Sequence, residues 1–512
     1  MAHPELPEPG LPLKLEPCSN GEYLPTPASR VVRRTVEETN RLVDGRARRL
    51  GMTRRQFLQS SAGMATMITV LAACSRDEGE VGGQFNAQPT ATTQPTEPTA
   101  TPRPVDPTAT APPAATAPVN PPDATAAPAP TATAEPPEID EEEAAEALSP
   151  PLGEFVFDIQ GHLLEYPDGS SANAPGFPQS ACGEADSRDC YGIDHFLEAI
   201  FVDSDTSMVM LSAIPFAPGA LSPEVMQRAI DVADQLGCAD RVLMQGESFP
   251  TSVGFDAMEE VAANFPIRAF KTYTHNGGPA WRLDDDTGNA YFEKVQEVGV
   301  PIVAVHKGLS GNDIWSSPVD VGPAAVNHPD VNILVYHSGY ENAFVEGPYS
   351  RDADFGVNRL ITSVIDAGNP GNVYAELGST WRNVMASPDQ AAHLIGKLLV
   401  NFGENNILWG TDAIWFGTPQ DQIQLFRAFQ ISEQFQEQFG YPALTDEIKA
   451  KIFGLNAARV FDVELPAATC AIDNEVIAEL RAQRQAGLLS TTNHTHAEHG
   501  LKTYQREFGH HA

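Results

Sequence analysis

Short apolar runs alternate with amphipathic stretches along the chain from Glu154 to about Leu465. The runs are rich in Val, Ile and Leu and carry few charges, which is typical of strands that are buried on both faces. Because a run and a helical stretch follow one another eight times, the pattern predicts an α/β fold with eight β-α units, the (β/α)8 or TIM barrel. The expected strands are Phe155–Gln160, Ser207–Ile214, Arg241–Glu247, Ile267–Tyr273, Pro301–His306, Val331–His337, Asn372–Leu377 and Ile407–Thr411.

The stretches between these runs have apolar residues at helical spacing. They predict helices at Gly192–Val202, Pro223–Leu236, Phe255–Asn264, Ala290–Glu297, Val321–Asn327, Asp354–Ala367, Gln390–Asn401 and Gln420–Phe435. An open, doubly wound parallel sheet is the structural alternative, but in that fold a Gly-rich phosphate-binding loop would follow the first strand. No such loop follows the first run, so the barrel is favoured.

Four polar residues stand at the ends of apolar runs, and they are His162, His306, His337 and Asp412. In a parallel barrel the carboxyl ends of all strands meet at one rim, so these side chains are expected to lie together. Alternation along an extended strand places Gln160 on the same side as His162. Imidazole and carboxylate groups are common ligands of transition metals. The pattern therefore predicts a metal site at this rim, although any one of these residues alone is more often structural.

An apolar stretch near the N-terminus follows a pair of arginines. Arg54 and Arg55 precede the run Ser60–Ala73, and Cys74 comes directly after it. The run is shorter than the ~20 residues that span a membrane, and an arginine-rich helix end before a core helix is the alternative. The stretch resembles a twin-arginine export signal with a lipobox, which implies cleavage before Cys74 and lipidation of its thiol. We therefore expect export by the twin-arginine machinery and a lipid anchor at the outer face of the cell membrane or in the periplasm.

Pro, Thr and Ala dominate the sequence from about Gln84 to Pro150. Such a composition cannot form a core and favours an extended, disordered stalk. The C-terminal tail is polar and contains five histidines, and we expect it to be disordered as well. The predicted division is residues 1–73 for an N-terminal extension with the signal, 74–150 for the stalk, 151–466 for the barrel, and 467–512 for a C-terminal helix and the His-containing tail.

The net charge of the chain narrows the range of molecules that the folded region can bind. The formal net charge of −36 argues against nucleic acid as a partner of the folded region.

Exported chains meet oxidising conditions, so Cys182 and Cys190, which flank a polar loop, are candidates for a disulfide, with two unpaired thiols as the alternative. The sequence contains no Cys-x-x-Cys pair, so a thiolate zinc site is not supported.

The polar residues of the rim follow the order found in one enzyme family. Its members carry His-x-His at strand one, a histidine after strand five, another after strand six and an aspartate after strand eight. From Glu154 to Val463 the chain resembles this family, the amidohydrolase superfamily, and especially its branch with aminocarboxymuconate-semialdehyde decarboxylase. The resemblance implies a metal-dependent hydrolase or decarboxylase. The matching residues are His162, His306, His337 and Asp412, and Gly454–Phe461 is similar to the family's closing helix.

One position departs from the family pattern, because Gln160 stands where the first histidine of His-x-His is expected. An amide oxygen binds a metal such as zinc more weakly than imidazole does. The resemblance implies a single divalent transition metal held by His162, His306 and Asp412, with Gln160 as an optional ligand. Zinc is the expected metal, and manganese and iron are the alternatives.

The resemblance implies a role for His337, and the chemistry of the rim and the composition of its loops indicate roles for the other residues. In the related decarboxylases the histidine after strand six activates water, so His337 is expected to do this or to bind the metal. Asp412 is expected to serve as ligand and general base. Lys271 ends strand four and is expected to pair with a substrate carboxylate or a structural acid. Arg382 and Trp381 follow strand seven and are expected to bind a planar or carboxylated substrate.

Together these features predict an envelope-anchored, metal-dependent hydrolase of amide, ester or lactone-like bonds in a small molecule. A nonoxidative decarboxylase on the same barrel is the first alternative. A non-catalytic binding lipoprotein with a degenerate metal site is the second. The substrate and the oligomeric state stay open, with a homo-oligomer as one option.

Overall fold

The structure is a computed structural model of the 512-residue chain. It describes residues 10–15, 23, 25–86, 144–145, 148, 154–165, 190–215, 220–276, 278–466, 470 and 472–485. The histidines of the predicted tail and most of the Pro/Thr/Ala-rich segment lie outside these residues, so the disorder predicted for them stays a prediction.

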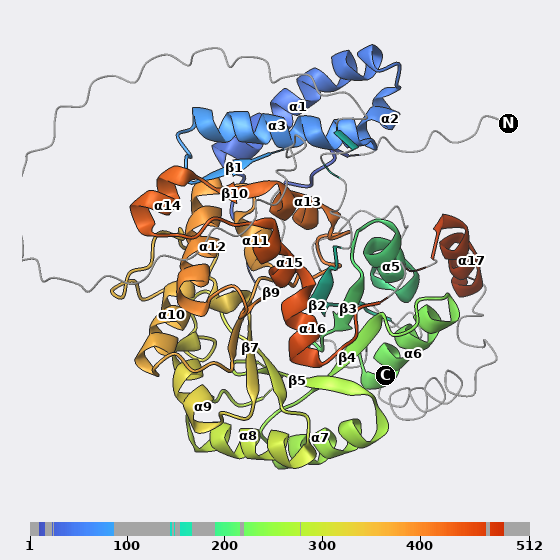
Figure 1. Ribbon diagram of the computed structural model, residues 1–512. Helices are drawn as coiled ribbons and strands as arrows, with labels where there is room; N and C mark the ends of the chain where they lie inside the picture. The colour runs from blue at the N-terminus through green and yellow to red at the C-terminus, as the bar shows by residue number, and fades with distance from the viewer. Residues whose placement is uncertain are drawn as a thin grey trace, which may run out of the picture.

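Eight parallel strands form one sheet in which each strand pairs with the next one along the chain. The sheet closes where Gly161 forms a parallel bridge with Ala413, beyond the last strand. Helices surround the ring of strands (Figure 1). The fold is therefore a (β/α)8 TIM barrel, which confirms the predicted fold class. The strands are β2 (Phe157–Gly161), β3 (Met208–Leu211), β4 (Val242–Glu247), β5 (Ile267–Tyr273), β6 (Ile302–His306), β7 (Asn332–Tyr336), β8 (Val373–Glu376) and β9 (Ile407–Leu408).

The helices that connect the strands lie close to their predicted positions. They are α5 (Ile193–Leu197) with the π-helix η3 (Glu198–Val202), α6 (Pro223–Gln235), α7 (Ser252–Asn264), α8 (Asp286–Val298), α9 (Val321–Asn327), α10 (Val357–Asp366), α11 (Thr380–Val384) and α12 (Pro388–Phe402). The short 3-10 helices η4 (Pro318–Asp320) and η5 (His337–Gly339) follow β6 and β7. Most of these helices place apolar residues against the sheet, as their amphipathic sequences require.

The eighth predicted helix, Gln420–Phe435, is wrong as a single helix. The chain forms α13 (Gln420–Ala428), then strand β10 (Phe429–Ile431), then α14 (Glu433–Phe439). The cause is a partner far away in the sequence, because β10 pairs antiparallel with β1 (Gly83–Phe85). A strand pair between segments this far apart in the sequence cannot be predicted from the local spacing of apolar residues.

The amino-terminal end of the barrel is filled by apolar side chains. Phe157, Tyr374 and Leu408 belong to one buried cluster there, together with Phe461 of α16 (Asn456–Phe461). The rings of Phe157 and Phe461 lie 5.8 Å apart. The preceding helices α15 (Asp446–Ala450) and η6 (Lys451–Leu455) lead the chain to this end. This closing segment packs and stabilises, as the resemblance implied.

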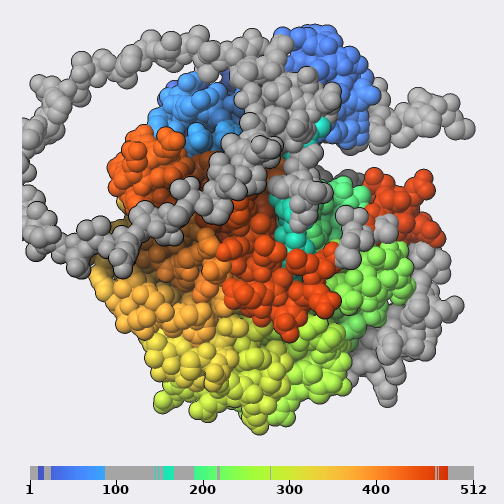
Figure 2. All heavy atoms as spheres, viewed as in Figure 1, coloured from blue at the N-terminus to red at the C-terminus, as the bar shows by residue number. Residues whose placement is uncertain are grey.

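The N-terminal region forms a helical layer on the side of the barrel. Helices α1 (Arg30–Arg49), α2 (Arg54–Leu58) and α3 (Ser61–Asp77) pack on one another, and β1 follows. Figure 2 shows this blue layer against the orange segment that contains α14. The stalk predicted to begin at residue 74 therefore starts too early, since the chain is helical to Asp77 and again ordered in β1. Within the described part of the chain, every helix is too short or too polar to cross a membrane.

The C-terminal helix α17 (Asn474–Gln485) is linked to the barrel by a disulfide between Cys238 and Cys470, whose Cα atoms are 4.9 Å apart. The two cysteines are 232 positions apart, so their spacing offers no sequence signal. Cys190 is also disulfide-bonded, whereas Cys182, its predicted partner, lies outside the described residues.

Candidate active site

The polar residues predicted for the metal site are all buried at the carboxyl ends of the barrel strands. His306 ends β6, and His337 directly follows β7. Gln160 lies in β2, with His162 just beyond it, while Asp412 comes four positions after β9. Parallel strands bring these ends to one rim, so five residues that are far apart in the sequence share one site.

Asp412 is the centre of this site because three side chains converge on its carboxylate. His162 Nε2 lies 3.0 Å from Oδ1, and Gln160 Nε2 donates to the same oxygen at 3.0 Å. Ser379 Oγ donates to Oδ2 at 2.5 Å. Burial raises the pKa of Asp412, but the hydrogen bond to His162 and the charges of His162 and His337 outweigh burial and hold this pKa well below its usual range. Asp412 is therefore ionised at neutral pH.

Backbone carbonyls fix the orientation of the three histidine rings. In each ring one nitrogen donates to a carbonyl oxygen, which assigns the proton to that nitrogen and leaves the other unprotonated in the neutral form. The bonds run from His162 Nδ1 to Ser212 at 2.7 Å, from His306 Nε2 to Gly308 at 3.0 Å, and from His337 Nδ1 to Gly378 at 2.7 Å. Such carbonyl partners are typical of metal-binding histidines.

The contact between His162 and Asp412 tests whether the site fits a metal. In a neutral His162 with its proton on Nδ1, the lone pair of Nε2 faces an ionised carboxylate oxygen at 3.0 Å. Two acceptors at this distance repel unless a cation lies between or beside them. A proton or a divalent metal ion satisfies this requirement, so the donor chemistry of the pair fits a metal.

The full ligand set is less complete than the resemblance implied. Among the described residues, no three His, Cys, Asp or Glu side chains are gathered in a way that could hold a metal ion. Gln160 directs its amide nitrogen toward Asp412, and its buried Oε1 has no hydrogen-bond partner in the described part of the structure. Rotation of the amide would exchange these two atoms. The site therefore offers a cation two strong ligands, His162 and Asp412. The amide oxygen of Gln160 could serve as a third, weaker ligand.

Glu376 organises the turn that carries His337. It accepts hydrogen bonds from the backbone N–H of His337 at 2.9 Å and of Gly378 at 2.6 Å. Both His337 and Ser338 adopt positive φ, 62° and 51°, a strained conformation for residues with side chains. A Cβ at Gly410 would lie 1.7 Å from Glu376 Oε1, so only glycine fits there. Burial raises the pKa of Glu376 to about 8.

Asp158 supports the site from below, and this role was missed by the sequence analysis. Its carboxylate accepts hydrogen bonds from the backbone N–H of Gln160 and of Thr411, both at 3.0 Å, and from the Thr411 hydroxyl. These bonds join β2 to the segment that carries Asp412. The alternation of Asp158, Gln160 and His162 along one strand was the available signal. Burial raises the pKa of Asp158 to about 7.

Lys271 is fully buried at the rim end of β5. Its Nζ lies 3.9 Å from the centre of the Tyr336 ring and 4.7 Å from that of Tyr273, so aromatic faces stabilise its charge. Burial, and also the positive charge of Lys271, lower the pKa of His337, which is about 4. Burial is the main reason that His337 is neutral, and Lys271 adds to it and provides positive charge close to the site.

Further aromatic and acidic residues surround the rim. Trp415 stacks on His162, with ring centres 5.3 Å apart. The ring centres of His275 and His306 are 5.0 Å apart, and burial lowers the pKa of His275 to about 4. Glu247 ends β4, and burial raises its pKa to about 7. Glu247 was not among the predicted site residues.

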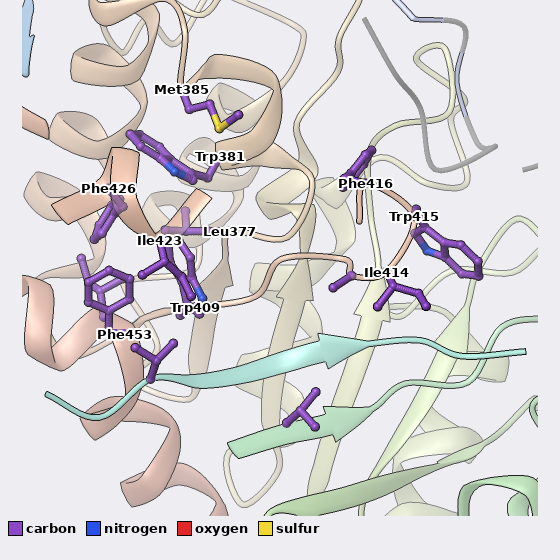
Figure 3. Close-up of a cluster of buried hydrophobic side chains, with 14 of the residues drawn as sticks. Leu377, Trp381, Met385, Trp409, Ile414, Trp415, Phe416, Ile423, Phe426 and Phe453 are labelled. Atoms are coloured by element: carbon purple, nitrogen blue, oxygen red, sulfur yellow. The ribbon is translucent and has the colours of Figure 1, made fainter. Parts of the chain in front are cut away.

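Two predicted substrate residues lie elsewhere. Trp381 is fully buried among core side chains, packs edge-on against Phe426 and donates from Nε1 to the carbonyl of Gln422 at 2.9 Å (Figure 3). Arg382 donates to the carbonyl of Lys14 at 2.5 Å, and its guanidinium lies 5.6 Å from the ring centre of Phe416. The expectation that Trp381 lines the mouth is therefore wrong, because α11 turns this face into the core.

Comparisons with known proteins are consistent with this geometry. A family model described as "Amidohydrolase" matches residues 205–463. No curated protein sequence matches the chain significantly.

Solved structures with a similar fold include three from bacteria. An uncharacterized TIM-barrel protein from Bordetella bronchiseptica is 14% identical, with 60% of this chain and 98% of that chain covered and a TM-score of 0.43. A protein described as a 2-pyrone-4,6-dicarboxylic acid hydrolase, from Pseudomonas putida, is 17% identical, with 61% and 99% covered and a TM-score of 0.39. A 5-carboxyvanillate decarboxylase from Novosphingobium aromaticivorans, in complex with manganese, is 14% identical, with 61% and 97% covered and a TM-score of 0.39. Identities this low assign no function to the chain.

Proposed function

Because this chain belongs to the amidohydrolase family, we propose that it is a metal-dependent hydrolase of an amide, ester or lactone-like bond in a small organic molecule. The observation that carries the proposal is the approach of His162 Nε2 to Asp412 Oδ1 at 3.0 Å. When His162 is neutral with its proton on Nδ1, this pair of acceptors needs a proton or a metal ion beside it. A divalent metal is the cation that hydrolases of this kind use.

The residues that would hold the metal are His162 and Asp412. His306 would join them through Nδ1 only after its ring moves closer, because no three such side chains are gathered for a metal among the described residues. Gln160 would add its amide oxygen after rotation of the side chain. Two imidazoles and one carboxylate form a ligand set that suits zinc, with manganese and iron as alternatives. When bound, the cation would polarise a substrate carbonyl and acidify water at the site.

His337 is the proposed general base. Its ring is held by the bond from Nδ1 to the Gly378 carbonyl, and its low pKa keeps Nε2 unprotonated at neutral pH. Nε2 takes a proton from the attacking water and returns it to the leaving group. Asp412 keeps its negative charge throughout, because its carboxylate is already surrounded by donors. Glu376 positions His337 through the backbone N–H.

Lys271 favours a substrate that carries a carboxylate near the reacting bond. Its buried ammonium group lies against two aromatic rings, where a carboxylate would gain a strong, charge-assisted hydrogen bond. The same feature supports decarboxylation as a second candidate function, since a bound carboxylate is then the group that is lost.

Product analysis separates these two reactions. We would incubate the metal-loaded chain with carboxylated lactones, amides and aromatic acids in ¹⁸O-labelled water. Hydrolysis incorporates the label into the organic product, whereas decarboxylation releases carbon dioxide and leaves the organic product unlabelled. A chain that binds metal but turns over none of these classes, while retaining ligand binding, would instead be a binding protein.

We also propose that the chain is exported by the twin-arginine machinery and anchored by lipid at Cys74. The residues that support this are Arg54, Arg55 and the run before Cys74. The disulfide between Cys238 and Cys470 supports export as well, because such bonds are rare in reducing compartments. Labelled palmitate should enter the native chain and not a Cys74→Ala variant. Replacing both arginines by lysine should leave the precursor in the cytoplasm.

A further inference from the structure

The two ends of the Pro/Thr/Ala-rich segment are attached to the same helix. The backbone N–H of Asn86 donates to the carbonyl of Ala428 at 2.9 Å, and Gln424 Nε2 donates to the carbonyl of Leu148 at 3.2 Å. Gln424 and Ala428 are one turn apart on α13, which is about 6 Å along the helix axis. The 61 residues between Asn86 and Leu148 therefore leave the barrel and return to it at nearly the same place.

Strand β1 fastens the chain to the barrel just before this segment. Gly83 lies opposite Ile431 of β10, and Phe85 lies opposite Phe429 with ring centres 5.6 Å apart. Phe85 is buried. A Cβ at Gly83 would lie 2.2 Å from the ring of Phe429, so the strand can dock this closely only with glycine at that position.

Asp389 holds the residues that lead into β1. Its Oδ1 accepts hydrogen bonds from the backbone N–H of Val81 at 2.7 Å and of Gly82 at 2.5 Å. The carbonyl of Gly82 in turn accepts from the backbone N–H of Ser432 at 2.9 Å. All of these partners belong to the barrel, and β1 also contacts α3 of the helical layer. The hydrogen bonding of residues 81–86 to the barrel involves no residue before Cys74. It would remain after cleavage of the signal.

We propose that β1 fastens the lipid-anchored N-terminus to the side of the barrel, so that the Pro/Thr/Ala-rich segment, whose two ends are both held at α13, does not separate the anchor from the barrel. The inference rests on the proposed lipid at Cys74. Val81 comes seven positions after Cys74, a distance that extended chain covers in about 25 Å. The face formed by β1, β10 and α14 therefore lies next to the bilayer, and its partner is the lipid surface.

Crosslinking tests the docked strand directly. Gln84 and Gln430 are opposite one another in the β1–β10 register, a geometry that suits a disulfide. The Gln84→Cys, Gln430→Cys double variant of the full chain should crosslink nearly completely, as peptide mapping would show. The matched control combines Gln84→Cys with Gln227→Cys on α6, on another side of the barrel in Figure 1, and should not crosslink. Equal crosslinking of both variants, or of neither, overturns the docking.

Energy transfer tests the placement at the membrane. The five tryptophans of the chain all lie between residues 281 and 415, inside the barrel, so their emission reports its distance from acceptor lipids in liposomes. Transfer should be equal for the full chain and for a chain that lacks residues 90–140. A Gly83→Val variant should lower it, whereas Gly371→Val, at a position with no atom near its Cβ, should not.

Transfer that is weak in the full chain and rises when residues 90–140 are removed would overturn the proposal, because the segment would then act as a spacer. A chain that shows no membrane association, with Cys74→Ala behaving identically, would overturn both the lipid anchor and the placement. The crosslinking result stays informative in that case, since it reports on the docking of β1 alone.

Discussion

The two ends of the barrel use the same strands for different purposes. At the amino-terminal end, Phe157 and Leu408 pack with Phe461 in an apolar cluster. At the carboxyl-terminal rim, His337 and Asp412 are buried with positive φ, at 62° and 60°. Residues in this conformation are strained, and buried polar groups must find partners to be tolerated. The packed end therefore supplies the stability that allows the rim to hold strained, charged side chains in place.

Loss of His337 should have the largest effect on activity. In a His337→Asn variant the amide can still donate to the Gly378 carbonyl, but the basic Nε2 is gone. We expect turnover to fall by about 10²–10⁴-fold, the usual contribution of a general base, with little change in stability. Steady-state kinetics and thermal denaturation would measure both.

His393 provides the control, since it is buried outside the site and bonds to the Tyr441 hydroxyl at 3.0 Å. His393→Asn should leave turnover nearly unchanged. In the native protein the acid limb of the pH–rate profile should fall near pH 4, because activity needs His337 neutral and its pKa is about 4. An acid limb near pH 7 that persists in His337→Asn would rule out His337 as the base.

Truncation at the opposite end should act on stability alone. Phe157 is fully buried, and Phe157→Ala should cost about 3–5 kcal/mol in the free energy of unfolding. The turnover of the protein that remains folded should be unchanged, because Phe157 lies at the far end of its strand from His162. Denaturant titration and active-site titration together check this. A large loss of turnover per folded molecule would mean that the two ends are coupled.

Glu247, which ends β4 at the rim, should make the free energy of unfolding depend on pH. Burial raises its pKa from 4.5 to about 7, so the folded state binds the proton more tightly than the unfolded state. Stability from this group is present below about pH 4.5 and is lost as the pH rises to about 7. Glu247→Gln removes the charge, so we expect it to stabilise the protein by about 1–3 kcal/mol at pH 8 and hardly at all at pH 4. Denaturation at the two pH values would show an equal effect at both if the burial argument is wrong.

Arg382 should have the smallest effect. Its guanidinium donates to the backbone carbonyl of Lys14 and lies against the ring of Phe416. Arg382→Ala should change kcat/KM by no more than about threefold, within the ~0.5 kcal/mol typical of surface changes. An increase in KM of tenfold or more for carboxylated substrates would restore the original expectation that Arg382 binds substrate.

Local patterns were sufficient to predict most of the barrel. The strand Ile267–Tyr273 and the helix Val321–Asn327 were predicted at their observed bounds, because β-rich composition and helical spacing are local properties. Features that depend on distant partners were missed. Strand β10 requires β1, and the bond between Cys238 and Cys470 joins positions 232 residues apart.

In the site, too, some features follow from local sequence patterns and others do not. Its position at the rim follows from strand order alone, so His162 and Asp412 could be expected to lie together. The direction of a side chain in a short helix could not, and Trp381 points into the core because α11 is only five residues long and starts from an unusual turn at Ser379, where φ is 53°. The contact of Ser379 with Asp412 was hidden for the same reason.

The metal content of the full chain tests the central claim most directly. The chain would be purified without chelator, supplied with zinc, manganese or iron, dialysed and analysed for bound metal, beside Asp412→Asn and Gln160→His variants. The account predicts about one ion per native chain, less in Asp412→Asn, and tighter binding in Gln160→His, since imidazole is the stronger ligand. Absence of bound metal from the native chain with all three metals would contradict it, and equal content in Asp412→Asn would place the ion elsewhere.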